Sequence, residues 1–337
     1  MTDPRLDVLC IGNAIVDVIA DASDEFLIAE GLTKDSMRLV DAEEAKRLYD
    51  HMQPAREVSG GCAGNTAAGI SALGGRAGFV GQVAPDQLGE FYIHDLTAAG
   101  VEFTTPPVDV GVPTARSMIL VTPDGHRTMN TFLGAAQELA ADVLDDEQIR
   151  ASAILYLEGY LWDPETPRFA MVRAIEIARQ AGRKIAFSLS DLFCVERHRE
   201  GFTALIEQGR IDILFANEAE ILAMAAVPHL DTAVDAIASK VETLVVTRGA
   251  AGALAVRGGQ RIDVSAEPVG EVVDTTGAGD SFNAGFLRAW LDGGTLRDCL
   301  ELAAVCGALS TRAVGGVDGQ PTFAEATAAL ATWRASR

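Results

Sequence analysis

Basic residues are scarce in this chain. Its 337 residues include 27 Lys plus Arg against 48 Asp plus Glu, which gives a formal net charge of −21. Such a surface repels nucleic acid and anionic membranes, because proteins that bind them present basic patches. We therefore expect no nucleic-acid partner and no membrane partner. Any phosphate site has to be built locally, from backbone amides, a few arginines and a metal ion.

Several common sequence patterns are also missing. No apolar run approaches the ~18 residues of a membrane span, and the first residues show no basic stretch followed by an apolar one. The five cysteines form no C-x-x-C pair, and the five histidines show no H-E-x-x-H spacing. We expect a cytoplasmic protein with reduced core thiols and no zinc site. No G-x-x-x-x-G-K-[ST] occurs, which excludes a P-loop enzyme.

Strand and helix patterns alternate regularly from Ala153 onward. This alternation predicts an α/β fold with a mostly parallel sheet covered by helices on both faces. Short β-like segments near Asp17, Met37, Val101 and Ala115 do not fit that rhythm, and we expect them to form a small β-sheet lid. The predicted units are a core of 1–11, 46–100 and 133–337, and a lid of 12–45 and 101–132. The protein is expected to be a monomer or a homodimer.

The most informative stretch is Asp274-Thr275-Thr276-Gly277-Ala278-Gly279-Asp280, which precedes an apolar-periodic helix pattern. A helix start exposes unpaired N–H groups, so it forms a natural anion site. Asp280 places a carboxylate beside that site, where it can take a proton from an attacking hydroxyl. Two alternatives are open at this point. Asp280 could be an ordinary first-turn acid, or Gly277-Ala278-Gly279 could begin a dinucleotide fingerprint.

Other polar residues follow further predicted strands. Asn13 and Asp17 come after the first strand, and Gly60-Gly61 with Asn65 forms a Gly-rich turn into a helix. Ligands of open α/β sheets lie at the carboxyl ends of the strands. Two more segments also follow predicted strands, namely Asn217-Glu218-Ala219-Glu220 and Thr247-Arg248-Gly249-Ala250-Ala251-Gly252. A third segment, Gly125-His126-Arg127, supplies a cation at a turn.

Together these motifs resemble the ribokinase (PfkB) family of carbohydrate and nucleoside kinases, over essentially the whole chain. The stretch from Asp274 to Asp280 matches the C-terminal signature of that family, and Gly60-Gly61 with Asn65 matches the N-terminal one. Within the family the chain is most similar to the adenosine kinases. That similarity rests on Gly12-Asn13 with Asp17, on Arg127-Thr128-Met129-Asn130, on Glu158-Gly159-Tyr160 and on the segment 212–218.

On the acceptor side, the resemblance implies that Asp280 is the general base. The anion hole for the transferred phosphoryl group would consist of Gly277, Ala278 and Gly279. The residues implied in substrate binding are Asn13 and Asp17 at the sugar hydroxyls, Gly61 and Asn65 beside them, and Arg127 reaching from the lid toward the phosphates. From their side chains, Met37, Phe132 and Tyr160 are expected to supply apolar and aromatic surface against which a purine stacks.

On the nucleotide side, the resemblance implies ATP and Mg²⁺ as cofactors, with K⁺ as a further candidate. Asn217 and Glu220 would organise Mg²⁺ through water, and Thr247, Gly249 and Gly252 would border ATP. Asp274 and the carbonyl of Thr276 match a monovalent-cation site.

The function expected from the sequence is ATP-dependent phosphorylation of the 5′-hydroxyl of a ribonucleoside, with adenosine converted to AMP. The sequence leaves other substrates open, namely ribose or fructose and the purine nucleosides inosine and guanosine. Two rivals from other classes also stay open, a nicotinamide-dependent oxidoreductase and a non-catalytic nucleoside-binding protein.

Overall fold

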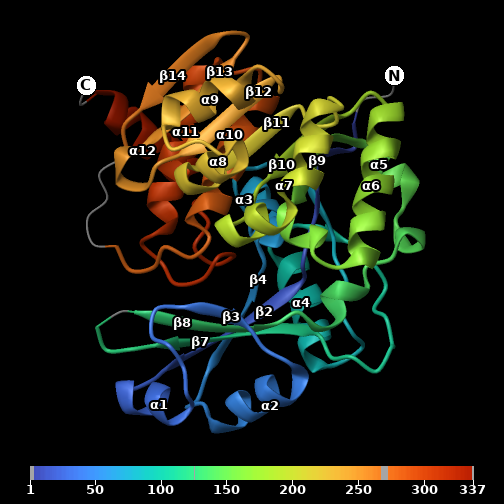
Figure 1. Ribbon diagram of the computed structural model, residues 1–337, viewed down its shortest axis with the longest axis vertical. Helices are drawn as coiled ribbons and strands as arrows, with labels where there is room; N and C mark the ends of the chain where they lie inside the picture. The colour runs from blue at the N-terminus through green and yellow to red at the C-terminus, as the bar shows by residue number, and fades with distance from the viewer. Residues whose placement is uncertain (1–3, 125, 267–271, 336–337) are drawn as a thin grey trace.

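A computed structural model describes residues 4–124, 126–266 and 272–335, which form two β-sheets of different size (Figure 1). The larger sheet consists of β1 (Leu6–Ile11), β5 (Ala77–Val80), β6 (Glu102–Phe103), β9 (Ser152–Glu158), β10 (Lys184–Ser188), β11 (Ile213–Asn217), β12 (Thr243–Thr247), β13 (Ala253–Arg257) and β14 (Gln260–Val264). Their order across the sheet is β14-β13-β12-β11-β10-β9-β1-β5-β6. The strands from β12 to β6 pair in parallel, and β13 and β14 add an antiparallel edge.

Alternate residues of the strands face two separate cores. In β1, Val8 and Cys10 belong to one hydrophobic cluster, whereas Leu9 and Ile11 belong to the other. The first core is covered by α3 (Cys62–Ala72), α4 (Gln87–Ala98), α10 (Ala278–Leu291), α11 (Leu296–Ser310) and α12 (Phe323–Ala335). The second is covered by α5 (Asp146–Arg150), α6 (Glu165–Gln180), α7 (Leu192–Glu207), α8 (Glu218–Ala225) and α9 (Leu230–Ala238). The predicted α/β sheet with helices on both faces is confirmed.

The smaller sheet has the order β3-β8-β7-β2-β4. Its strands are β2 (Ile15–Asp21), β3 (Met37–Leu39), β4 (Arg56–Gly60), β7 (Ala115–Val121) and β8 (Arg127–Phe132). Two helices, α1 (Asp24–Ala29) and α2 (Ala42–His51), cover the face turned away from the larger sheet (Figure 1). Leu27 and Leu48 of these helices pack against Met118 and Leu120 of β7 in a core of their own. The smaller unit is therefore a separately packed layer.

The limits of the two units differ from the sequence prediction at two places. Residues 46–100 were assigned to the core, but β4 pairs with β2 in the smaller sheet, and α2 packs beneath that sheet. Residues 101–132 were assigned to the lid, but β6 pairs with β5 of the larger sheet. The sequence of β4, REVSG, does not indicate a strand, because only one of its residues is a strong β-former and its last residue is a glycine.

Short 3-10 segments complete the chain at η1 (Gly134–Glu138), η2 (Ala141–Val143), η3 (Gly159–Trp162) and η4 (Gly249–Ala251). Gly125, the first residue of the segment Gly125-His126-Arg127, lies outside the described residues. All five cysteines are free thiols, and four of them are buried, as expected. Within the described ranges, no single helix is long and apolar enough to cross a membrane. The bent pair of helices α8 and α9 together resembles a membrane span in length and composition only.

Candidate active site

The carboxyl ends of five neighbouring parallel strands lie along one edge of the larger sheet. Glu158 at the end of β9 lies opposite Ser188 of β10, and Asn217 at the end of β11 lies opposite Thr247 of β12. Asn13 follows the end of β1, the next strand beyond β9. Since open α/β sheets bind ligands at this edge, the expected acceptor residues lie near β1 and β9. The expected nucleotide residues lie farther along, near β11 and β12.

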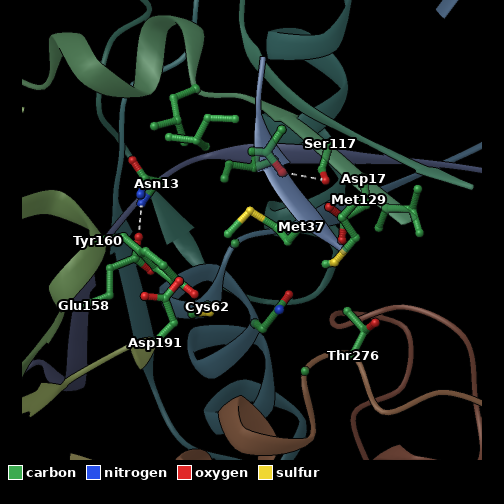
Figure 2. A pocket seen from close by; sticks show the side chains of 18 of the residues that line it. Asn13, Asp17, Met37, Cys62, Ser117, Met129, Glu158, Tyr160, Asp191 and Thr276 are labelled. Carbon is green, nitrogen blue, oxygen red and sulfur yellow. Dashed lines mark hydrogen bonds between the residues drawn. The ribbon is translucent and has the colours of Figure 1, made fainter. Parts of the chain in front are cut away.

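A cavity of about 410 Å³ lies between this edge and the smaller sheet (Figure 2). It brings together nine of the residues singled out from the sequence, namely Asn13, Asp17, Met37, Gly61, Asn65, Tyr160, Thr276, Gly277 and Asp280. These residues come from both sheets and from the first turns of α3 and α10. The geometry therefore supports one site from residues more than 250 positions apart in the chain.

Two helix N-termini meet at the cavity. Gly277 is the N-cap of α10 with φ 74°, and no side chain caps that helix start. Gly61 is the N-cap of α3 with φ 84°, and a Cβ at this position would lie 2.2 Å from the carbonyl oxygen of Asn13. Both positions therefore require glycine. The first-turn amide of Gly279 lacks an acceptor inside α10 and is suited to bind an anion. The N–H of Ala278 donates a 3.2 Å hydrogen bond to the carbonyl oxygen of Thr275.

Asp280 lies in the first turn of α10 and is only 8% exposed. The Nδ2 group of Asn65 donates a 2.8 Å hydrogen bond to its Oδ2 atom. Burial raises the pKa of Asp280 to about 6, while hydrogen bonds from Asn65 and the Cys62 thiol act in the opposite direction. A buried carboxylate with this pKa is ionised at neutral pH and basic enough to accept a proton from a hydroxyl.

Asp17, on β2, supplies a second buried carboxylate to the cavity wall. Burial raises its pKa to about 7, and the neighbouring Asp274 adds to that rise. Gly60 makes room for it, because a Cβ at Gly60 would lie 2.5 Å from Oδ2 of Asp17. Within the described part of the chain, no group is found to donate a hydrogen bond to this carboxylate. Its oxygens are available to accept hydrogen bonds from ligand hydroxyls.

Glu158 is a site residue to which the sequence analysis gave no role. It is fully buried, and burial raises its pKa to about 7. Its Oε1 atom accepts the backbone N–H of Asn13 at 2.7 Å (Figure 2), and Oε2 accepts the N–H of Ala63 at 2.8 Å. The carboxylate thus joins the loop after β1 to the first turn of α3. Its place at a strand end, beside Gly159, was a usable signal in the sequence.

The remaining wall of the cavity is largely apolar. The smaller sheet contributes side chains that the sequence analysis did not assign, at Ile15, Leu39, Ser117, Ile119, Met129 and Thr131. The larger unit contributes Tyr160, together with Phe193, whose side chain is 61% exposed at the rim. Asp191, the N-cap of α7, also lines this side. Phe132, expected to contact a purine, packs instead in the core of the smaller unit.

Arg127 of β8 reaches from the smaller sheet to the Asp274–Asp280 motif. Its Nη1 atom lies 2.5 Å from Oδ1 of Asp274 and donates a 2.8 Å hydrogen bond to Oγ1 of Thr276. The Asp274 carboxylate also accepts the N–H of Thr276 at 2.7 Å and that of Gly315 at 3.0 Å. Arg127 is thus held at the motif rather than in the open cavity.

The sequence profile of the pfkB family carbohydrate kinases matches residues 6–322. The chain belongs to the PfkB family. Members of this family transfer a phosphoryl group to a hydroxyl of a sugar or a nucleoside, so this chain is a phosphotransferase. That result confirms the resemblance and excludes the nicotinamide-dependent alternative for Gly277-Ala278-Gly279.

The named PfkB relatives include both nucleoside kinases and sugar kinases. The solved adenosine kinase from Sinorhizobium meliloti is 46% identical, with a TM-score of 0.89, over 97% of this chain and 99% of that one. A probable sugar kinase from Rhizobium etli is 43% identical, with a TM-score of 0.90, over 98% and 99%. The adenosine kinase of Saccharomyces cerevisiae is 28% identical over 94% of this chain and 96% of its own length. A probable fructokinase of Arabidopsis thaliana is 29% identical over 81% and 88%.

The expected Mg²⁺ residues form a helix cap in this PfkB chain. The Asn217 side chain accepts the N–H of Glu220, and the Glu220 carboxylate accepts the N–H of Asn217 at 2.9 Å. Burial raises the pKa of Glu220 to about 7. Among the described residues, no group of three His, Cys, Asp or Glu side chains is placed to hold a metal ion. A protein site with one carboxylate suits Mg²⁺, which takes most of its ligands from water and phosphates.

Thr247, Gly249 and Gly252 lie outside the cavity, around η4 after β12. Gly252 has φ 91°, and a Cβ there would lie 2.1 Å from the carbonyl oxygen of Val264. The structure thus gives Gly252 a packing reason in the β13–β14 hairpin. A contact of these three residues with ATP stays a prediction.

Proposed function

We propose that this kinase transfers the γ-phosphoryl group of ATP to the 5′-hydroxyl of adenosine. The observation that carries this proposal is the mixed lining of the cavity. Asn13, Asp17 and Asp280 supply polar groups, whereas Ile119, Met129 and other apolar side chains of the smaller sheet supply apolar surface. A nucleoside has the same two kinds of surface, with a hydroxylated ribose and a flat base that gains from leaving water. A free sugar has no base to cover these apolar side chains, which would stay in contact with water.

In the proposed complex, the Asp17 carboxylate and the Asn13 side chain accept and donate hydrogen bonds at the ribose hydroxyls. That arrangement directs the 5′-hydroxyl toward Asp280, which removes its proton as the hydroxyl oxygen attacks phosphorus in line with the leaving oxygen. The backbone amides of Gly277, Ala278 and Gly279, at the N-terminus of α10, stabilise the charge on the transferred group. Closure of the smaller sheet excludes water and keeps Arg127 near the phosphates.

ATP would lie along the strand edge beyond this cavity. Thr247, Gly249 and Gly252 border that region, and Glu220 with Asn217 would hold Mg²⁺ through water. Mg²⁺ would neutralise charge on the phosphates during transfer. AMP formation from adenosine fits salvage of preformed purine nucleosides in the cytoplasm.

Phosphorylation of a free sugar is the second candidate. It is supported by the similarity to a probable fructokinase from Arabidopsis thaliana and to a probable sugar kinase from Rhizobium etli. Inosine and guanosine are further candidates, because the apolar wall would accept any purine. The groups near the rim that could discriminate among bases are polar ones, such as Arg38 and Asp191.

The test is kcat/KM for adenosine, inosine, guanosine, ribose and fructose under one set of conditions. Adenosine should give the highest value. A higher value for either sugar than for every nucleoside would transfer the assignment to sugar phosphorylation. A higher value for inosine or guanosine would retain the nucleoside class and reject adenine.

A matched pair of variants tests the apolar wall directly. Met37 lines the cavity and is 44% exposed, so Met37→Ser should fold normally. We expect it to lower kcat/KM for adenosine by about tenfold, the usual order for a lost base contact, with ribose turnover unaffected. The control is Ile28→Ser, on the outer helix α1, where the side chain is 78% exposed. Equal losses for adenosine and ribose would contradict the base contact.

A further inference from the structure

The monovalent-cation site implied by the family resemblance does not match the surroundings of Asp274. The side chain of Asp274 is fully buried, and Arg127, Thr276 and Gly315 donate to its two oxygens. One of these donors is already a full positive charge, and the Arg127 side chain is itself only 17% exposed. A second cation at this carboxylate would be repelled by the guanidinium in a weakly screened environment.

We propose that Arg127 takes the place of a bound monovalent cation at Asp274. The arginine side chain thereby supplies, from the smaller sheet, the charge that keeps the phosphate-binding turn in shape. Catalysis by this chain accordingly does not require K⁺. This inference concerns the charge balance of Asp274 and holds for any acceptor substrate.

The position of Asp274 explains how this ion pair can affect the geometry around the general base, Asp280. Its Oδ2 atom holds the N–H of Gly315, next to Gly316. Gly316 packs so closely that a Cβ there would lie 2.3 Å from the Asn65 side chain, which binds Asp280. A Cβ on Gly277 would lie 2.8 Å from the Cα atom of Gly316. Loss of charge balance at Asp274 would therefore displace the loop on which Gly277 and Asn65 rest.

The ion pair also joins the two sheets. Arg127 begins β8 of the smaller sheet, while Asp274 and Thr276 precede α10 of the larger unit. An internal cation of this kind is present at Asp274 only while the smaller sheet is closed. Binding of a diffusible ion would not depend on closure of the smaller sheet in this way. Arg127 is thus a positioning residue that acts through Asp274.

The first experiment compares potassium chloride with tetramethylammonium chloride at equal ionic strength, because the organic cation is too large for a carboxylate–carbonyl site. The melting temperature needs no substrate, so its result is independent of the adenosine assignment. For the wild-type chain, we expect melting temperatures within about 1 °C of each other, which is a small difference in stability for a chain of this size. Values of kcat should agree within twofold.

The second experiment uses Arg127→Gln, which leaves Asp274 buried without its cation. In tetramethylammonium the melting temperature should fall by about 5 °C or more, because an uncompensated buried charge is strongly destabilising. Potassium should restore at least half of that loss, since a small cation can now enter.

Arg56→Gln is the matched control. Arg56 on β4 pairs with Asp318 and so also joins the smaller sheet to the C-terminal part of the chain, but both side chains are exposed. Its melting temperature should change by less than about 2 °C and should not respond to potassium.

Two results would overturn the proposal. One is stabilisation or activation of the wild-type chain by potassium over tetramethylammonium, which would show a cation bound beside Arg127. The other is an Arg127→Gln variant that responds to potassium no more than the wild type does. If Arg127→Gln does not fold, the wild-type comparison still decides, because it requires no variant.

Discussion

The Nδ2 group of Asn65 lies 2.8 Å from Oδ2 of Asp280 and joins the first turn of α3 to the first turn of α10. Its hydrogen bond lowers the pKa of Asp280, against the rise caused by burial. The Oδ1 atom of the same side chain is buried without a hydrogen-bond partner. The amide is thus fixed by its place between two helices, and one of its effects is to keep the base ionised at neutral pH.

Asn65→Ala should raise the pKa of Asp280 and move the low-pH limb of the kcat profile to higher pH. A hydrogen bond to a charged group contributes about 1.5–3 kcal/mol, so we expect about a tenfold loss of turnover at pH 6. The loss at pH 8.5 should be below about threefold. Ser71→Ala, on the same helix, should leave the profile unchanged. A uniform loss at every pH would show that Asn65 does not act through the pKa of Asp280.

Asp280→Asn should reduce turnover by roughly 10²–10⁴-fold, the usual contribution of a positioned general base. Binding of the nucleoside, measured by calorimetry, should change little because the amide has nearly the same shape. Asp292→Asn at the exposed end of the same helix is the control. Retention of more than a tenth of wild-type turnover would reject Asp280 as the base.

Stability should depend on pH in the direction opposite to activity. The folded-state pKa of Asp280 is about 6, against 3.8 for an unperturbed Asp. A raised pKa gives a contribution to folding that is present below pH 3.8 and lost as pH rises through 6. Asp17, Glu158 and Glu220 have the same sign, with pKa values of about 7. The melting temperature of the ligand-free protein should therefore fall between about pH 4 and about pH 7.

The same argument predicts that Asp280→Asn stabilises the protein at pH 8 by about 3 kcal/mol, with an effect below about 1 kcal/mol near pH 4. Thermal unfolding at the two pH values measures this difference directly, and Asp292→Asn should follow the wild type. A variant that is destabilised equally at both pH values would contradict the desolvation of Asp280.

Asp17→Ala should raise KM for the nucleoside and also lower kcat by at least tenfold, because the reacting hydroxyl loses its orientation. The exposed Asp21→Ala, at the end of the same strand, is the control. An unchanged KM at saturating ATP would remove Asp17 from the acceptor site.

Amide exchange in β7 and β8 should slow when nucleoside binds, since these strands line the cavity and would close over the ligand. Exchange in β11, on the far part of the larger sheet, serves as the internal reference. Indifference of β7 and β8 to a nucleoside shown to be bound by calorimetry would contradict lid closure.

Much of the site was predictable because parallel strands place their carboxyl ends together. Asn13, Asn217 and Thr247 each follow a buried apolar run, so their common edge followed from the strand pattern alone. Recognition of the Asp274–Asp280 motif then led to the prediction that Asp280 is the general base. Glu158 obeyed the same strand-end rule and could have been assigned in the same way.

Other features were not predictable, for physical reasons. In β7, Met118 and Leu120 pack under the sheet, while Ile119 lines the cavity. Both faces are apolar, so alternation does not reveal which one meets a ligand. The contact between Arg127 and Asp274 joins residues far apart in the chain, and no local pattern specifies it. β4 was missed because pairing with β2, and not its own composition, makes it a strand.

The direct passage from β4 through Gly60 and Gly61 into α3 has a consequence for engineering. Gly60 accommodates Asp17, Gly61 accommodates the carbonyl of Asn13, and the following turn carries Asn65. At this junction no loop separates the smaller sheet from helix α3, which carries Asn65. A chimera that exchanges the smaller sheet with that of a relative should therefore cross over inside α3, beyond Asn65. If the boundary lay in the loop before β4, Asp17 and Asn13 would come from one parent, whereas Gly60, Gly61 and Asn65 would come from the other.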